Sequence, residues 1–124
     1  MSTREVKIPG PDHPITIRPA GTRVVARVGD EVIAETDAAL ALQEASYPEV
    51  LYVPLADVRP EVLRPSHTST HCPYKGDASY YDLLAGGREL TDAVWTYREP
   101  YDAVAAIAGH VAFYPDRVDV AAEA

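Results

Sequence analysis

Eleven prolines in a chain of 124 residues restrict its fold more than any other feature of the sequence. Proline lacks a backbone N–H and breaks a helix when it lies in the interior, so frequent prolines keep every element short. No internal repeat, low-complexity tract or change of composition marks a linker between domains. We therefore expect short elements joined by many turns instead of long helices.

Several short runs of β-prone residues predict an antiparallel structure. Residues 23–28 and 31–35 flank Gly29-Asp30, which predicts a hairpin with a type II′ turn. Further extended segments are expected at residues 50–53, 67–72, 78–84, 88–97, 110–114 and 118–120, the last two as a second hairpin. Short helices are expected at residues 38–45, 57–63 and 101–108. The sequence thus predicts a mainly β fold with short helices (α+β), arranged as a small antiparallel sheet or open barrel.

The length of the chain fits one domain. A chain of 124 residues can bury a core, and 47% apolar with 24% charged residues is typical of globular proteins. We expect a single domain over residues 1–124 with its core at about 15–120. An N-terminal arm containing Pro9, Gly10 and Pro11 and a tail beyond Val120 are expected to be flexible.

The charge of the chain disfavours two classes of partner. Eleven basic and nineteen acidic residues give a net charge of −8, and the basic residues form no cluster, so we expect neither nucleic acid nor an anionic membrane surface as partner. No stretch approaches the roughly 20 apolar residues of a membrane helix, and the N-terminus lacks the apolar run of a secretory signal. One cysteine cannot form an internal disulfide, which fits a reducing compartment. The expected location is the cytoplasm.

Residues 66–81 form the segment richest in groups that can carry chemistry. His67, His71 and Cys72 are zinc-ligand types, but on a strand the two histidines face one side and the cysteine the other. No Cys-x-x-Cys pair is present, and a closed site would need help from His13 or His110. We therefore expect no metal and no other cofactor.

The same segment offers two further interpretations. Lys75 and a nearby imidazole could lower the pKa of the Cys72 thiol and make it a nucleophile, whereas a buried cysteine would act as a small apolar side chain. The turn between Pro73 and Gly76 could instead present backbone N–H groups and the Lys75 ammonium to a carboxylate, phosphate or carbonyl oxygen. The sequence leaves these alternatives open.

Aromatic residues supply the second candidate feature. The chain has eight tyrosines and one tryptophan but only one phenylalanine, a bias that favours a wet cavity over a dry core. The aromatic side chains could pack in the core, or they could line a pocket that adds directional hydroxyl groups to apolar walls. Such a pocket would be walled by Trp95 and several of the tyrosines.

The order of these residues resembles a known family. The residues that carry the resemblance are Ala39-Leu40, Glu44, Tyr47-Pro48, Tyr52, Pro54, Asp57-Val58, Thr70, Cys72-Pro-Tyr-Lys-Gly76, Ala78, Tyr80, Ala93-x-Trp95-x-Tyr97, Pro100, Ile107 and Val111-Ala-Phe-Tyr114. This pattern, between about Arg23 and Tyr114, resembles domain of unknown function 427.

The resemblance implies a small bacterial β-tent-like domain, akin to zinc-bearing ligand-binding domains and methionine sulfoxide reductases. Zinc in that wider group is held by paired Cys-x-x-Cys motifs, which this chain lacks. The family is sometimes labelled nucleotidyltransferase. A magnesium-dependent transferase needs paired carboxylates, but the chain contains no Asp-x-Asp motif. Asp37 is better explained as a helix cap, and the pair Glu35 and Asp37 as a solvent-exposed strand edge.

We expect the chain to bind a small molecule in a Trp/Tyr-lined pocket next to the Cys-Pro-Tyr-Lys-Gly turn, because polar and aromatic residues cluster in the pattern that carries the resemblance. The residues expected to form this site are Tyr52, Tyr74, Trp95 and Tyr97 as walls, Lys75 and Arg23 as groups that orient a ligand, and Glu44 as a buried acceptor. One alternative is an enzyme of transferase or hydrolase type that uses Cys72 or Lys75. The other is an interaction module that forms a homodimer through a sheet edge.

Overall fold

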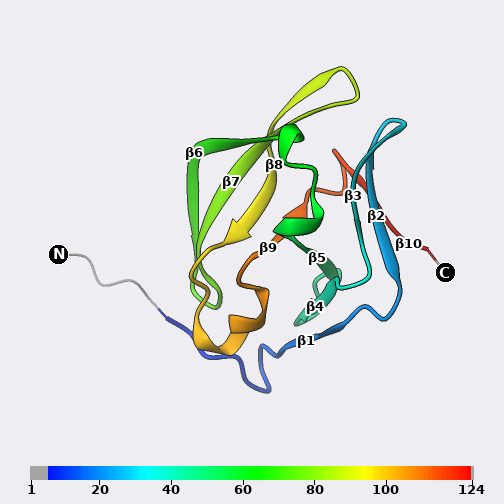
Figure 1. Cartoon of the computed structure of the whole chain (residues 1–124). Coiled ribbons are helices and arrows are strands. Elements are labelled where there is room, and N and C mark those ends of the chain that lie inside the picture. The colour runs from blue at the N-terminus through cyan, green and yellow to red at the C-terminus, as the bar shows by residue number, and fades with distance from the viewer. Residues whose placement is uncertain (1–5, 124) are drawn as a thin grey trace.

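The computed structural model describes residues 6–123 and is built mainly from antiparallel strands, as the sequence predicts (Figure 1). Its strands are β1 (Ile15–Pro19), β2 (Arg23–Val28), β3 (Glu31–Thr36), β4 (Leu40–Glu44), β5 (Val50–Pro54), β6 (Leu63–Cys72), β7 (Gly76–Ala85), β8 (Arg88–Tyr97), β9 (His110–Phe113) and β10 (Asp119–Glu123). Three short 3-10 helices connect them, namely η1 (Leu55–Asp57), η2 (Pro60–Val62) and η3 (Asp102–Ile107).

The strands form two sheets. Seven lie in the order β1-β4-β5-β9-β8-β7-β6, and three lie in the order β10-β2-β3. Figure 1 shows the three-stranded sheet on the right and the long strands β6 and β7 on the left, with β5 and β9 between them. Neither sheet closes into a barrel. Among residues 6–123, no helix has the length and the apolar content needed to cross a membrane.

The predicted hairpin at the start of the chain is confirmed. β2 and β3 pair antiparallel, with Val28 opposite Glu31. Gly29 has a φ of 59°, the sign that a type II′ turn requires at its first central position, where glycine avoids the steric cost of a Cβ.

The helix predicted at residues 38–45 is wrong. Its central residues form β4, which pairs with β1 on one side and with β5 on the other, so that Leu40 lies opposite Tyr52 and Leu42 opposite Val50. A helix of eight residues is marginal by itself in water. Pairing on both edges and burial of Ala41 and Leu42 outweigh the local helical preference.

The second predicted hairpin is also wrong. β9 pairs with β8 and β5, whereas β10 pairs with β2 in the other sheet. Pro115 lies between them, and the chain turns there, with the N–H of Val118 donating to the carbonyl of Tyr114 at 3.0 Å. The tail expected beyond Val120 is therefore part of a paired strand as far as Glu123. Residues 1–5 of the expected N-terminal arm and Ala124 lie outside the described residues.

The two faces of the seven-stranded sheet belong to two hydrophobic clusters. On β5 the neighbours Tyr52 and Val53 are both buried, yet Val53 belongs to the cluster shared with β2 and β3 and Tyr52 to a second cluster. The second cluster also contains Val104 and Ile107 of η3. Since successive strand residues point to opposite faces, the sheet is covered on one side by the three-stranded sheet and on the other partly by η3.

Two neighbouring leucines of β7 give a test of this arrangement. Leu83 is fully buried between the sheets, whereas Leu84 is 38% exposed. Leu83→Ala should lower the free energy of unfolding by about 2–5 kcal/mol, because it removes apolar contacts and leaves a cavity. Leu84→Ala should cost less than about 1 kcal/mol. Urea denaturation of both variants measures the difference, and equal losses would contradict the assignment of Leu83 to the core.

Candidate binding pocket

A hollow of about 180 Å³ opens beside the second cluster. Five residues that the sequence analysis singled out line it: Glu44, Tyr52, Lys75, Trp95 and Tyr97. The remaining lining residues are three further tyrosines and three aliphatic side chains, namely Tyr47, Tyr80, Tyr114, Leu42, Pro48 and Val50. Segments far apart in the chain therefore build one mixed aromatic and polar wall.

Strand pairing fixes the aromatic part of this wall. Tyr80 on β7 lies opposite Trp95 on β8, so both side chains project from the same face of the sheet. The indole Nε1–H of Trp95 donates to the hydroxyl of Tyr52 at 3.2 Å, and the ring of Tyr114 lies 4.6 Å from the indole. Trp95 is thus held from two sides while it remains partly exposed.

An ion pair forms the polar end of the hollow. The ammonium of Lys75 donates to one carboxylate oxygen of Glu44, and both side chains are largely buried, at 11% and 15% exposure. The other carboxylate oxygen of Glu44 contacts Nε2 of His13 at 2.8 Å. The His13 ring stacks on Tyr74 with 4.0 Å between centroids. His13 thereby joins the N-terminal segment to the ion pair.

The ionisation states in the pocket follow from burial and these contacts. Burial alone would raise the pKa of Glu44, but the hydrogen bonds and charges of Lys75 and His13 outweigh it and hold that pKa below its ordinary value. Burial raises the pKa of Tyr52 to about 12 and also raises the pKa of Tyr97. At neutral pH the pocket therefore contains a compensated ion pair and the protonated phenols of Tyr52 and Tyr97.

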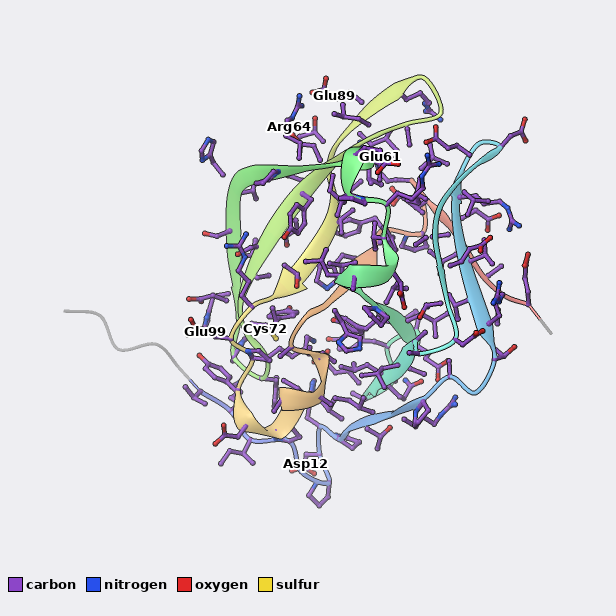
Figure 2. The ribbon with its side chains drawn as sticks, in the orientation of Figure 1. Asp12, Glu61, Arg64, Cys72, Glu89 and Glu99 are labelled. Atoms are coloured by element: carbon purple, nitrogen blue, oxygen red, sulfur yellow. The ribbon has the colours of Figure 1, made fainter. Side chains whose placement is uncertain are left out.

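Three of the predicted site residues lie outside the wall. Tyr74 does not line the hollow, but its ring stacks on His13, which contacts Glu44. Cys72 is partly buried against the second cluster, close to the turn between β6 and β7, and does not line the hollow (Figure 2). Arg23 lies in the other sheet, half exposed, with its guanidinium 3.3 Å from Asp37.

The histidines of β6 do not assemble a metal centre. No group of three His, Cys, Asp or Glu side chains in the part of the chain that the structure describes is placed to hold a metal ion. Nδ1 of His71 lies 2.8 Å from a carboxylate oxygen of Asp77. These residues therefore do not form the closed zinc site considered for the sequence.

The sequence analysis did not assign three residues that matter for the site. Tyr80 and Tyr114 belong to the abundant tyrosines, but nothing in the local pattern shows that they face the hollow. His13 is separated from Glu44 by 31 positions, and no local sequence pattern predicts that contact. Only the pairing of the strands brings these groups together.

The ion pair makes stability depend on pH in a defined direction. Because the pKa of Glu44 lies below its ordinary value of 4.5, its carboxylate stabilises the fold above that value, and this contribution is lost as the pH falls through the pKa of the folded state. Glu44→Gln should therefore lower the free energy of unfolding by about 1–3 kcal/mol at neutral pH. The difference from wild type should shrink below pH 4.5.

Urea denaturation across this pH range measures the effect. Glu49→Gln is the matched control, because Glu49 pairs with Arg18 on the exposed surface and its removal should cost less than about 1 kcal/mol. If the loss of unfolding free energy in Glu44→Gln stayed constant from neutral to acid pH, the charge of the Glu44 carboxylate would not contribute to stability.

Comparison with protein families places this sequence in a known group. The model of the family described as "Domain of unknown function (DUF427)" matches residues 16–124, which includes every residue that lines the hollow. A comparison with curated proteins found no match. The chain belongs to the domain of unknown function 427 family.

Proposed function

We propose that the hollow beside Trp95 binds a small molecule. The observation that carries this proposal is the meeting of an aromatic wall with a largely buried ion pair in one partly open cavity. Apolar walls supply the favourable burial, and a few fixed polar groups supply orientation, which is the usual composition of a ligand site. Trp95 and Tyr97 form the wall, and Lys75 with Glu44 forms the polar end.

The volume limits the part of a ligand that this hollow holds to about one ring. A cavity of about 150 Å³ can hold a benzene molecule in a protein interior. The hollow of about 180 Å³ therefore has room for a single six-membered ring with one or two small polar substituents. A nucleotide would fill far more space than this cavity provides.

The charge of the site favours an uncharged ligand. The ammonium of Lys75 is already compensated by Glu44, and the phenols of Tyr52 and Tyr97 stay protonated. An anion would find no unpaired cation among the residues that line the hollow, and the chain carries a net charge of −8. An amide can accept from Lys75 through its oxygen and donate to Glu44 through its N–H without separating the pair, whereas a ketone carbonyl can only accept from Lys75.

The position of Cys72 favours a binding site over an enzyme in which this thiol is the nucleophile. A thiol nucleophile must reach the reacting carbon of its substrate. Cys72 packs against the second cluster and is not among the residues that line the hollow. The site therefore offers recognition groups without an aligned nucleophile.

A thermal-shift screen of uncharged and anionic single-ring compounds tests the proposal. Compounds that bind should raise the melting temperature of wild type and have little effect on Trp95→Ala, because the variant loses the central wall of the hollow. Uncharged carbonyl or amide compounds should predominate among the hits. At a concentration of about 100 times Kd, the stabilisation should be about 2.7 kcal/mol.

Tyr81→Ala is the matched control. Tyr81 is the neighbour of Tyr80 on β7 but packs against the cluster between the sheets, so this variant should lose stability yet keep the ligand-induced shift. The proposal fails if no compound shifts wild type, or if every shift survives in Trp95→Ala.

A further inference from the structure

A second hollow lies against Trp95. It has a volume of about 260 Å³ and is bounded by β5, by the end of β9 and by β10 of the other sheet. Three residues, Pro48, Val50 and Trp95, line both hollows. The two cavities are therefore neighbours that share one wall.

The second hollow differs from the first in its chemistry. Its other walls include Leu51, Phe113, Val118 and Val120, which are apolar, and no lysine or arginine lines it. Carboxylates are contributed by Glu49, which pairs with Arg18 at 2.8 Å, and by the exposed Asp119. Such walls offer water few hydrogen-bond partners and repel anions, so the cavity suits an uncharged apolar group.

We propose that the two hollows form one cleft and hold the two ends of a single elongated, uncharged molecule. Its polar end lies at the Lys75–Glu44 pair, and its apolar end passes Trp95 into the second hollow. This inference rests on the proposed function of the first hollow and adds the class of ligand, namely a polar ring with an apolar extension.

The position of Trp95 supports one ligand over two independent ones. Its indole contacts both Tyr52 and Tyr114, so one well-held side chain lines both cavities. Pro48 and Val50 also line both hollows, which gives the two cavities further wall in common. A molecule that entered only the first hollow would leave the apolar walls of the second exposed to water. Burying an apolar extension there gains about 25 cal/mol for each Å² removed from water.

A homologous series of ligands measures this extension directly. Benzamide, 4-ethylbenzamide and 4-butylbenzamide carry the same uncharged amide, which can accept from Lys75 and donate to Glu44, and differ only in the alkyl chain. Trp95 is the sole tryptophan, so its fluorescence reports occupancy at the shared wall. Affinity for wild type should rise about fourfold for each added methylene, as expected for burial of apolar surface.

Two variants of β10 locate the alkyl chain. Val120→Phe fills the second hollow from a partly exposed position and leaves the first hollow unchanged. This variant should bind benzamide with the affinity of wild type, but its affinity should not rise with the length of the alkyl chain. Ala122→Phe adds the same side chain to the same strand at an exposed position that does not line the hollow, and it should retain the gain.

The outcomes distinguish failure of the joined cleft from failure of the first hollow. If benzamide binds and the chain length has no effect, the first hollow keeps its function and the joined cleft is wrong. If the dependence on chain length survives in Val120→Phe, the extension lies elsewhere and the inference is overturned. Failure of the whole series to quench Trp95 would overturn both. A wild-type dimer in light scattering that Val120→Phe dissociates would assign the second hollow to a second copy of the chain instead.

Discussion

The hydrogen-bonded ion pair between Lys75 and Glu44 is the contact on which the shape of the site depends. Glu44 ends β4 and Lys75 precedes β7, and three strands separate β4 from β7 in the sheet. With strands about 4.8 Å apart, a flat sheet would place β4 and β7 at least about 19 Å from each other, farther than the two side chains can reach. The sheet must therefore curl and twist until these segments meet. The hollow lies within that curl, with β5 and β8 supplying Tyr52 and Trp95 between the two ends.

The same ion pair allows two charged side chains to lie largely buried at one end of the site. A lysine and a glutamate removed from water cost free energy unless they are paired, and here each compensates the other. His13 adds a third partner from a segment that precedes the first strand, so the N-terminal part of the chain helps hold the ion pair. Its ring stacks on Tyr74, which lies in the same turn as Lys75. The turn and the N-terminal segment thus support each other beside the hollow.

Local patterns predicted the elements whose partners are close in the chain. The β2–β3 hairpin follows from Gly29-Asp30, because the conformation of a two-residue turn is determined largely by its own two residues. β4 could not be predicted in this way, since its pairing with β1 and β5 is what makes it a strand. The same contrast holds for the site. Trp95 and Lys75 belong to the family pattern from which the site was predicted, and both line the hollow, whereas Arg23 was predicted for the same site and lies in the other sheet.

The preference for tyrosine over phenylalanine has a physical reason in this arrangement. A wall of phenylalanines beside the Lys75–Glu44 pair would leave unsatisfied the polar atoms of any ligand that the pair did not reach. Phenol hydroxyls can both donate and accept, and burial keeps those of Tyr52 and Tyr97 uncharged. They therefore add directionality without adding charge. In a chain with a net charge of −8, such a wall suits the uncharged ligand that we propose, because its hydroxyl groups offer hydrogen bonds while the surrounding field disfavours anions.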